Sequence, residues 1–96
     1  MMQERGTAAD AAISFLLRQG RGWDQDGQVY RAMSSYFDIL QRYPDSQEAS
    51  EAKDRLLEIA RGFEEDGQTY RAMGLYDRLA RVEEGTYSYI GTYGEY

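Results

Sequence analysis

One eight-residue stretch occurs twice in this chain, as DGQVYRAM at residues 26–33 and as DGQTYRAM at residues 66–73. Aligning residues 21–36 with residues 61–76 gives ten identities in sixteen positions. A repeat with a period of about 20–50 residues is typical of stacked supersecondary units. The sequence therefore predicts two copies of one unit, related by an offset of forty residues.

Apolar residues recur at intervals of three and four within each copy, which is the spacing of an amphipathic helix. In the first copy they are Ala12, Leu16, Gly20 and Trp23, and then Val29, Ala32, Met33, Tyr36, Leu40 and Tyr43. In the second copy they are Ala52, Leu56, Leu57, Ile59, Ala60 and Phe63, and then Tyr70, Met73, Tyr76, Leu79 and Val82. This pattern predicts helices at about residues 7–25, 28–43, 46–65 and 68–83.

Residues that favour helix ends separate these stripes. Pro44 ends the second predicted helix, and Ser46 is suited to cap the start of the third. Gly67 can take the left-handed conformation that closes a helix. The short DGQ turn then makes each pair of helices an antiparallel hairpin.

The repeated small and aromatic residues have a geometric role in this arrangement. Ala32 and Ala72 are the positions where two helices can cross closely, and Tyr36 and Tyr76 fill space between neighbouring hairpins. The predicted fold class is all-α, with four helices in two antiparallel helix-turn-helix hairpins.

The predicted organisation is a helical repeat domain over residues 1–84, followed by a Tyr/Gly-rich tail over residues 85–96. Repeat 1 covers about residues 7–44 and repeat 2 about residues 46–84. Three interpretations of the tail stay open: it is a disordered terminus, it covers the last hairpin, or it docks on another protomer. The covering interpretation places it around Leu75, Leu79 and Val82.

The composition argues against several classes of function. The net charge of −6 disfavours nucleic acid and anionic membranes as partners. The chain has no His and no Cys, and its Ser residues lie in no recognisable catalytic motif, so we expect no enzyme, no metal site and no cofactor. No apolar run is long enough to span a membrane and no signal peptide is visible, so a cytoplasmic location is the expectation.

One acidic segment matches part of a calcium-binding loop. Asp24, Asp26 and Gly27 match the third, fifth and sixth positions of an EF-hand. The first and twelfth positions would be Gly22 and Met33, which have no carboxylate. The segment is therefore interpreted as a polar helix end, and Trp23 with the aromatic and Met stripes is interpreted as core.

The order of residues in each copy resembles the tetratricopeptide repeat family. That pattern has a small residue, an aromatic, a turn Gly, an Ala, an aromatic and a Pro in order. The matching residues are Gly20, Trp23, Gly27, Ala32, Tyr36 and Pro44 in the first copy, and Ala60, Phe63, Gly67, Ala72 and Tyr76 in the second. The departures are a period of forty residues against the family's about 34, Glu84 in place of the second Pro, and Gln19 in place of a usual Leu.

The resemblance implies a concave groove, lined by the first helix of each hairpin, that receives a peptide or a partner helix. The groove positions carried over from the family are Ser14, Leu17, Arg21, Asp24 and Gln25, and Asp54, Leu57, Arg61, Glu64 and Glu65. Arg21 and Arg61 would then form cationic rungs for a carboxylate or a carbonyl of the ligand. The alternative is that both Arg side chains pair with an acid one helical turn away.

The predicted function is therefore a non-catalytic protein–protein interaction module with a protein or peptide partner. The alternative is a structural module that forms a homo-oligomer through exposed hairpin faces. Two repeats are fewer than the about three that make a helical array stable by itself, so both interpretations expect another surface to complete the stack.

Overall fold

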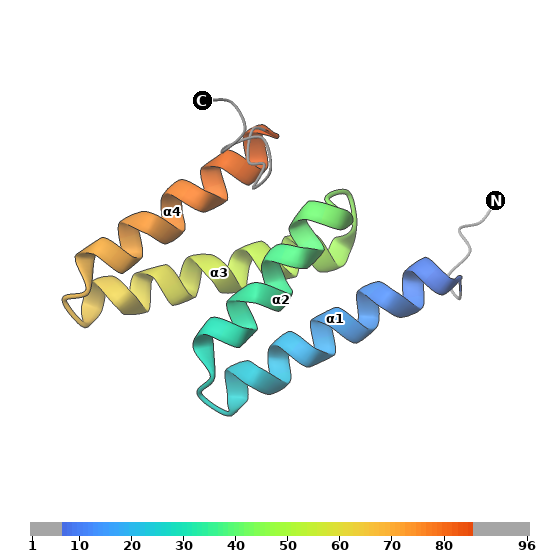
Figure 1. Cartoon of the computed structure of the whole chain (residues 1–96), viewed down its shortest axis with the longest axis horizontal. Helices are drawn as coiled ribbons and strands as arrows, with labels where there is room; N and C mark the ends of the chain where they lie inside the picture. The colour runs from blue at the N-terminus through green and yellow to red at the C-terminus, as the bar shows by residue number, and fades with distance from the viewer. Residues whose placement is uncertain (1–6, 86–96) are drawn as a thin grey trace, which may run out of the picture. The chain divides into compact units, whose positions relative to one another are not determined.

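The computed structural model describes residues 7–85, which form four helices and no strand within that range. They are α1 (Ala8–Gln25), α2 (Val29–Arg42), α3 (Gln47–Glu65) and α4 (Thr69–Glu84), arranged in sequence as two hairpins (Figure 1). The predicted all-α class is confirmed, and each predicted helix end lies within one residue of the observed one. The predictions for the tail lie outside the described residues from residue 86 onward. None of the described helices has the length and apolar character that crossing a membrane requires.

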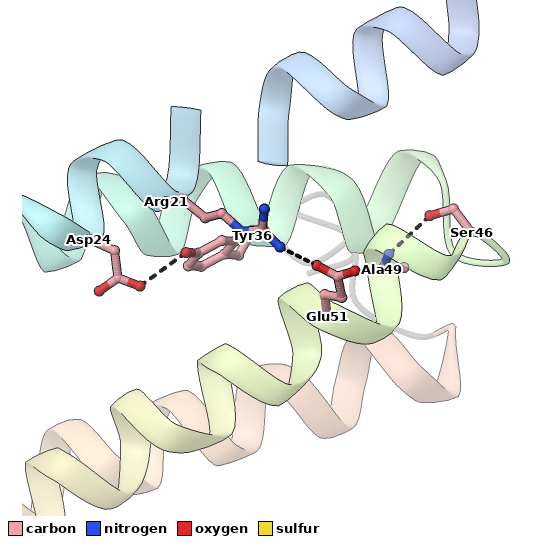
Figure 2. A network of polar contacts seen from close by, with 6 residues as sticks. All are labelled: Arg21, Asp24, Tyr36, Ser46, Ala49 and Glu51. Carbon is pink, nitrogen blue, oxygen red and sulfur yellow. Dashed lines mark hydrogen bonds and ion pairs between the residues drawn. The ribbon is translucent and has the colours of Figure 1, made fainter. Parts of the chain in front are cut away.

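Hydroxyl side chains begin two of the helices. The Thr7 Oγ1 accepts a hydrogen bond from the Asp10 N–H at 3.1 Å at the start of α1. The Ser46 Oγ accepts one from the Ala49 N–H at 3.0 Å at the start of α3, as Figure 2 shows. Each bond satisfies a backbone donor that has no partner inside the helix. The predicted cap at Ser46 is confirmed.

The two DGQ turns have the same geometry. Gly27 and Gly67 both have a φ of +79°, in the left-handed region that favours glycine. The next residue in each copy, Gln28 or Gln68, donates its N–H across the turn at 2.8 Å, to the carbonyl of Trp23 and of Phe63 respectively. This is the Schellman closure of a helix. The repeated letters therefore produce the same hairpin turn twice.

The described chain divides into two compact units between Leu56 and Leu57, within α3. The first unit contains α1, α2 and the first half of α3. Helices α1 and α2 pack side by side (Figure 1). Buried residues of α2 lie on more than one of its faces, since both α1 and the first half of α3 belong to the same unit. The core of this unit is Ile13, Leu17, Ala32, Tyr36, Phe37, Ile39, Leu40, Ala49, Ala52 and Leu56.

The closest packing in the first unit is between Gly20 and Tyr36. A Cβ atom added to Gly20 would lie 2.7 Å from the Cε1 of the Tyr36 ring, which is too close for any side chain. The absence of a side chain at this position lets the aromatic ring lie directly on α1, and Tyr36 is only 2% exposed. Packing at the interior's normal density leaves no room for an added methyl group.

The second unit contains the rest of α3 and α4. Its buried residues are Ile59, Ala60, Phe63, Ala72, Leu75 and Leu79. The expectation that Tyr70 and Met73 are core residues is wrong, because they are 90% and 61% exposed. Within residues 57–85 no helix follows α4, so the face that carries them is left uncovered by the described part of this unit.

Candidate functional site

Three side chains form a polar joint in the first unit. Asp24, near the end of α1, accepts two hydrogen bonds from Arg55 of α3: Nε donates to Oδ2, and Nη2 donates to Oδ1 at 2.9 Å. The hydroxyl of Tyr36, on α2, donates to the same Oδ2 at 3.0 Å (Figure 2). A forked guanidinium–carboxylate contact is stronger and more directional than a neutral hydrogen bond. This joint therefore ties together α1, α2 and the first half of α3.

The joint shifts the pKa values of its members. The hydrogen bond from Arg55 holds the pKa of Asp24 below its usual value of 3.8, against the opposing effect of burial, and the Tyr36 hydroxyl adds to the lowering. Burial, with the neighbouring Asp24 carboxylate, raises the pKa of Tyr36 to about 12. Asp24 is thus held ionised and Tyr36 is held neutral, which is the state in which the hydrogen bond between them forms.

A second ion pair lies one helical turn before the first. Arg21 of α1 donates through its Nη2 to the Oε1 of Glu51 on α3 (Figure 2). Both side chains are about half exposed, so the pair contributes little to stability by itself. Glu51 and Arg55 are four residues apart on one face of α3. Together they present alternating charge to Arg21 and Asp24 on α1.

The second unit repeats only part of this joint. The hydroxyl of Tyr76, on α4, donates to the Oε1 of Glu64 at 3.3 Å, and the two residues are twelve apart in the chain, as Tyr36 and Asp24 are. Desolvation, followed by the negative charge of Glu64, raises the pKa of Tyr76. Among residues 7–85, no Arg or Lys forms an ion pair with Glu64.

The residues predicted to line the groove differ in exposure. Within the first unit, Leu17 is buried, Ser14 is half-buried, and Arg21 and Asp24 are engaged with α3. Half-buried Leu57 is the most enclosed of the predicted groove residues in the second unit. The remaining predicted groove residues in the two units are exposed, and they are Gln25, Asp54, Arg61, Glu64 and Glu65. The set therefore contains residues that support the fold and residues that are available to a ligand.

The alternative of local pairing for the two Arg rungs is wrong. Arg21 pairs with Glu51, thirty residues away in the chain, and not with an acid one turn along α1. Arg61 has no ion pair within the described residues 7–85. An i,i+4 pair does occur elsewhere, since the Nε of Arg81 donates to the Oδ2 of Asp77 at 3.0 Å on α4.

Aromatic side chains are also accessible in the first unit. The guanidinium of Arg31 lies 4.8 Å from the centre of the half-buried Trp23 ring, a cation–π contact that covers one face of the indole. Phe15, on α1, is 52% exposed.

Within residues 7–85, no cluster of three or more acidic, His or Cys side chains is arranged to hold a metal ion.

The residues that sequence reasoning missed are Glu51 and Arg55, which hold α3 against the first hairpin. A signal for them exists, since they are an oppositely charged pair at i and i+4 on a helix with an apolar stripe. Their counterparts in the first copy, forty residues earlier, are Ala11 and Phe15. The pair therefore lies outside the matched positions of the repeat, which is why comparing the two copies did not reveal it.

The chain matches no family model, no curated protein and no solved structure. The description of the fold as two helical hairpins therefore depends on the helices and turns described above.

Proposed function

We propose that this chain is a non-catalytic protein–protein interaction module, built of two tetratricopeptide-like hairpins. Its first helices, α1 and α3, bind a peptide or a helix of a partner protein. The proposal is supported by the shared turn geometry, by the shared Tyr–carboxylate contact, and by the accessible polar side chains on α1 and α3.

One observation carries the proposal most directly. The repeated residues Ala32 and Ala72 are buried, whereas Gln25 and Glu65, which are equivalent but different in the two copies, are exposed. Exposed polar positions that vary within a repeated scaffold are where such a module can adapt to a partner. Buried repeated residues such as Ala32 and Ala72 thus build the scaffold, and exposed positions that differ, such as Gln25 and Glu65, adapt the two copies to a ligand.

The engaged side chains have a separate role in this proposal. Arg21 and Asp24 already contact α3, so changing them would alter the packing of the first unit as well as any ligand contact. Binding is therefore assigned mainly to exposed positions of the two first helices, which are Gln25 on α1 and Asp54, Arg61 and Glu65 on α3.

Photo-crosslinking tests this assignment. A photoreactive amino acid is placed at Gln25, Asp54 or Glu65, and at Gln41 as an exposed control on α2. We expect the first three positions to capture one common protein from the source cell, and the control not to. The captured protein is then purified, and its affinity for a Gln25→Ala, Asp54→Ala, Glu65→Ala variant should be at least about tenfold lower, a change of 1.4 kcal/mol. Unchanged affinity in a variant that keeps its helix content would contradict the proposal.

Self-assembly is the second candidate function, and exposed apolar side chains favour it. Phe15, Tyr70 and Met73 present large apolar groups to solvent on α1 and α4. Large apolar side chains that are exposed in the single chain can be buried when two copies associate. Sedimentation equilibrium over a hundredfold range of concentration is the test, with Phe15→Gln and Met73→Gln as variants. A strict monomer at every concentration excludes this function.

A further inference from the structure

The first unit shows how one hairpin receives the next helix. Arg21 and Asp24, three residues apart on α1, pair with Glu51 and Arg55, four residues apart on α3. The charges are complementary in order along the two helices. The receiving helix α1 has a cation followed by an acid, and the docking helix α3 has an acid followed by a cation. Tyr36 completes the contact by donating to the receiving acid.

The second unit has the same receiving groups. Arg61 and Glu64 lie forty residues after Arg21 and Asp24, and Tyr76 donates to Glu64 as Tyr36 does to Asp24. Both Arg61 and Glu64 are exposed. Within residues 7–85, Glu64 has no cationic partner and Arg61 has no ion pair. The second unit therefore has the same receiving groups as the first, and within residues 7–85 no helix forms an ion pair with them.

The residues that follow α4 do not repeat the pair formed by Glu51 and Arg55. The residues forty positions after Glu51 and Arg55 are Gly91 and Glu95, and residues 85–96 contain no Lys or Arg. A second copy docking through α1 would present Ala11 and Phe15 at the two charged positions. Neither alternative places a cation at the position that Arg55 holds in the first unit.

The face of α4 also favours a charged partner. Asp77 and Glu83 are exposed, whereas the equivalent residues on α2 are Phe37, which is buried, and Tyr43, which is half-buried. The surface next to Tyr76 is thus less apolar than its counterpart in the first unit and carries charges of both signs, since Arg78 and Arg81 stand where α2 has Asp38 and Gln41. Complementary charge on a partner directs its docking and excludes partners of like charge.

We propose that the second hairpin binds a helix of another protein that carries an acidic residue and, four positions later, an arginine. The arginine binds Glu64 beside the Tyr76 hydroxyl, and the acid binds Arg61. This inference rests on the proposed interaction function and narrows it to one partner chemistry. The first half of α3, which makes these two contacts in the first unit, supplies the peptide used to test the proposal.

The probe is a fluorescein-labelled peptide of residues 44–60, which contains Glu51 and Arg55, and its binding to the full chain is measured by fluorescence anisotropy. We expect saturable binding that is at least about tenfold weaker for the Arg55→Gln peptide, because a charge-assisted hydrogen bond is lost. A Glu64→Gln chain should bind both peptides equally weakly. An Asp66→Asn chain is the matched control, since it removes a neighbouring exposed carboxylate, and it should keep the tenfold difference.

Charge reversal gives the sharpest form of the test. A Glu64→Arg chain should bind an Arg55→Glu peptide better than it binds the original peptide, and the original chain should show the opposite preference. Because the peptide could also displace α3 from the first hairpin, only the dependence on Glu64 supports the inference.

Three results would overturn it. The first is that the Arg55→Gln peptide binds as well as the original peptide. The second is that the chain is a dimer that Glu64→Gln converts to a monomer. The third is that the peptide binds only after residues 86–96 are deleted. The second result identifies another copy as the occupant, and the third identifies the tail. None of them affects the crosslinking test at Gln25, Asp54 and Glu65, so failure here is distinguishable from failure of the proposed function.

Discussion

The two hairpins use the same turn and the same Tyr–carboxylate pair, yet the pair lies in different surroundings. Tyr36 is 2% exposed and its partner Asp24 is held by Arg55, whereas Tyr76 is half-buried and its partner Glu64 is exposed. The difference does not come from the pair, because its spacing and its hydrogen bond recur. It comes from the first half of α3, which belongs to the first unit. A repeated sequence therefore fixes the local joint, and the neighbouring helix decides whether that joint is core or surface.

Truncating the two tyrosines should separate the joints most strongly. Tyr36→Ala removes a buried ring and should lower the free energy of unfolding by about 3–5 kcal/mol, the usual cost of deleting a core aromatic. Tyr76→Ala removes a half-buried ring and should cost about 1 kcal/mol, typical of point mutations away from a packed core. Urea unfolding followed by circular dichroism measures both. Equal losses in the two variants would mean that the joints are equally buried in solution.

Replacing two glycines of α1 should change stability in opposite directions. Gly20→Ala places a Cβ against the Tyr36 ring and should cost about 1–3 kcal/mol, the usual penalty of overpacking. Gly22→Ala meets nothing within 4 Å and should stabilise the helix by about 0.5–1 kcal/mol. Thermal unfolding of the two variants is the measurement. If Gly20→Ala were also stabilising, the close contact of α1 with Tyr36 would be absent.

The sequence predicted the fold to within one residue at each helix end, because the repeat, the helical spacing and the turn glycines all indicate the same four helices. It did not predict which members of each stripe are buried. Met33 is half-buried and its repeat equivalent Met73 is exposed, although their local sequences are nearly identical. Burial of these residues depends on what covers them, and local periodicity contains no information about that.

The predicted site shows the same limit in its charged residues. Arg21 and Arg61 are equivalent in the repeat, and sequence reasoning treated them as equivalent rungs of a groove. Arg21 is engaged by Glu51, whereas Arg61 has no ion pair within residues 7–85. A contact over thirty residues depends on how α3 packs on the first hairpin, so the spacing of charges on α1 alone could not predict it.

Removing the guanidinium of Arg55 should weaken the joint of the first unit alone. Arg55→Gln leaves Asp24, whose side chain is 13% exposed, with the Tyr36 hydroxyl as its remaining partner. We expect a loss of about 1–2 kcal/mol at pH 7, near the lower end for charge-assisted hydrogen bonds because Arg55 is partly in water. Glu64→Gln in the second unit should change the free energy of unfolding by less than about 0.5 kcal/mol.

Acid titration provides the control for that prediction. The pKa of Asp24 is lowered in the folded state, so its contribution to stability is complete above its usual pKa of 3.8 and is lost as the pH falls through the lowered value. The difference in the free energy of unfolding between the original chain and Arg55→Gln should therefore shrink below about pH 4. A difference that stays constant from pH 7 to strongly acid conditions would assign the effect of Arg55 to packing and not to Asp24.

The smallest expected effect distinguishes the two tyrosine hydroxyls at alkaline pH. The pKa of Tyr36 is raised from 10 to about 12 in the folded state, so its contribution is complete below pH 10 and is lost as the pH rises toward 12. Tyr36→Phe cannot ionise at this position, and at pH 8 it should be about 1 kcal/mol less stable because it lacks the hydrogen bond to Asp24. That gap should narrow between pH 10 and 11, because only the original chain then gains ionised Tyr36 in its unfolded state. All other titrating groups are common to both chains and cancel in the difference.

Tyr76→Phe, measured by the same urea titrations, should show a smaller loss of stability at pH 8, since its hydroxyl and Glu64 lie at the surface. If the Tyr36→Phe gap were the same at pH 8 and pH 11, the hydroxyl of Tyr36 would not be held neutral by burial beside Asp24, and the two joints would be alike in the one property that most separates them.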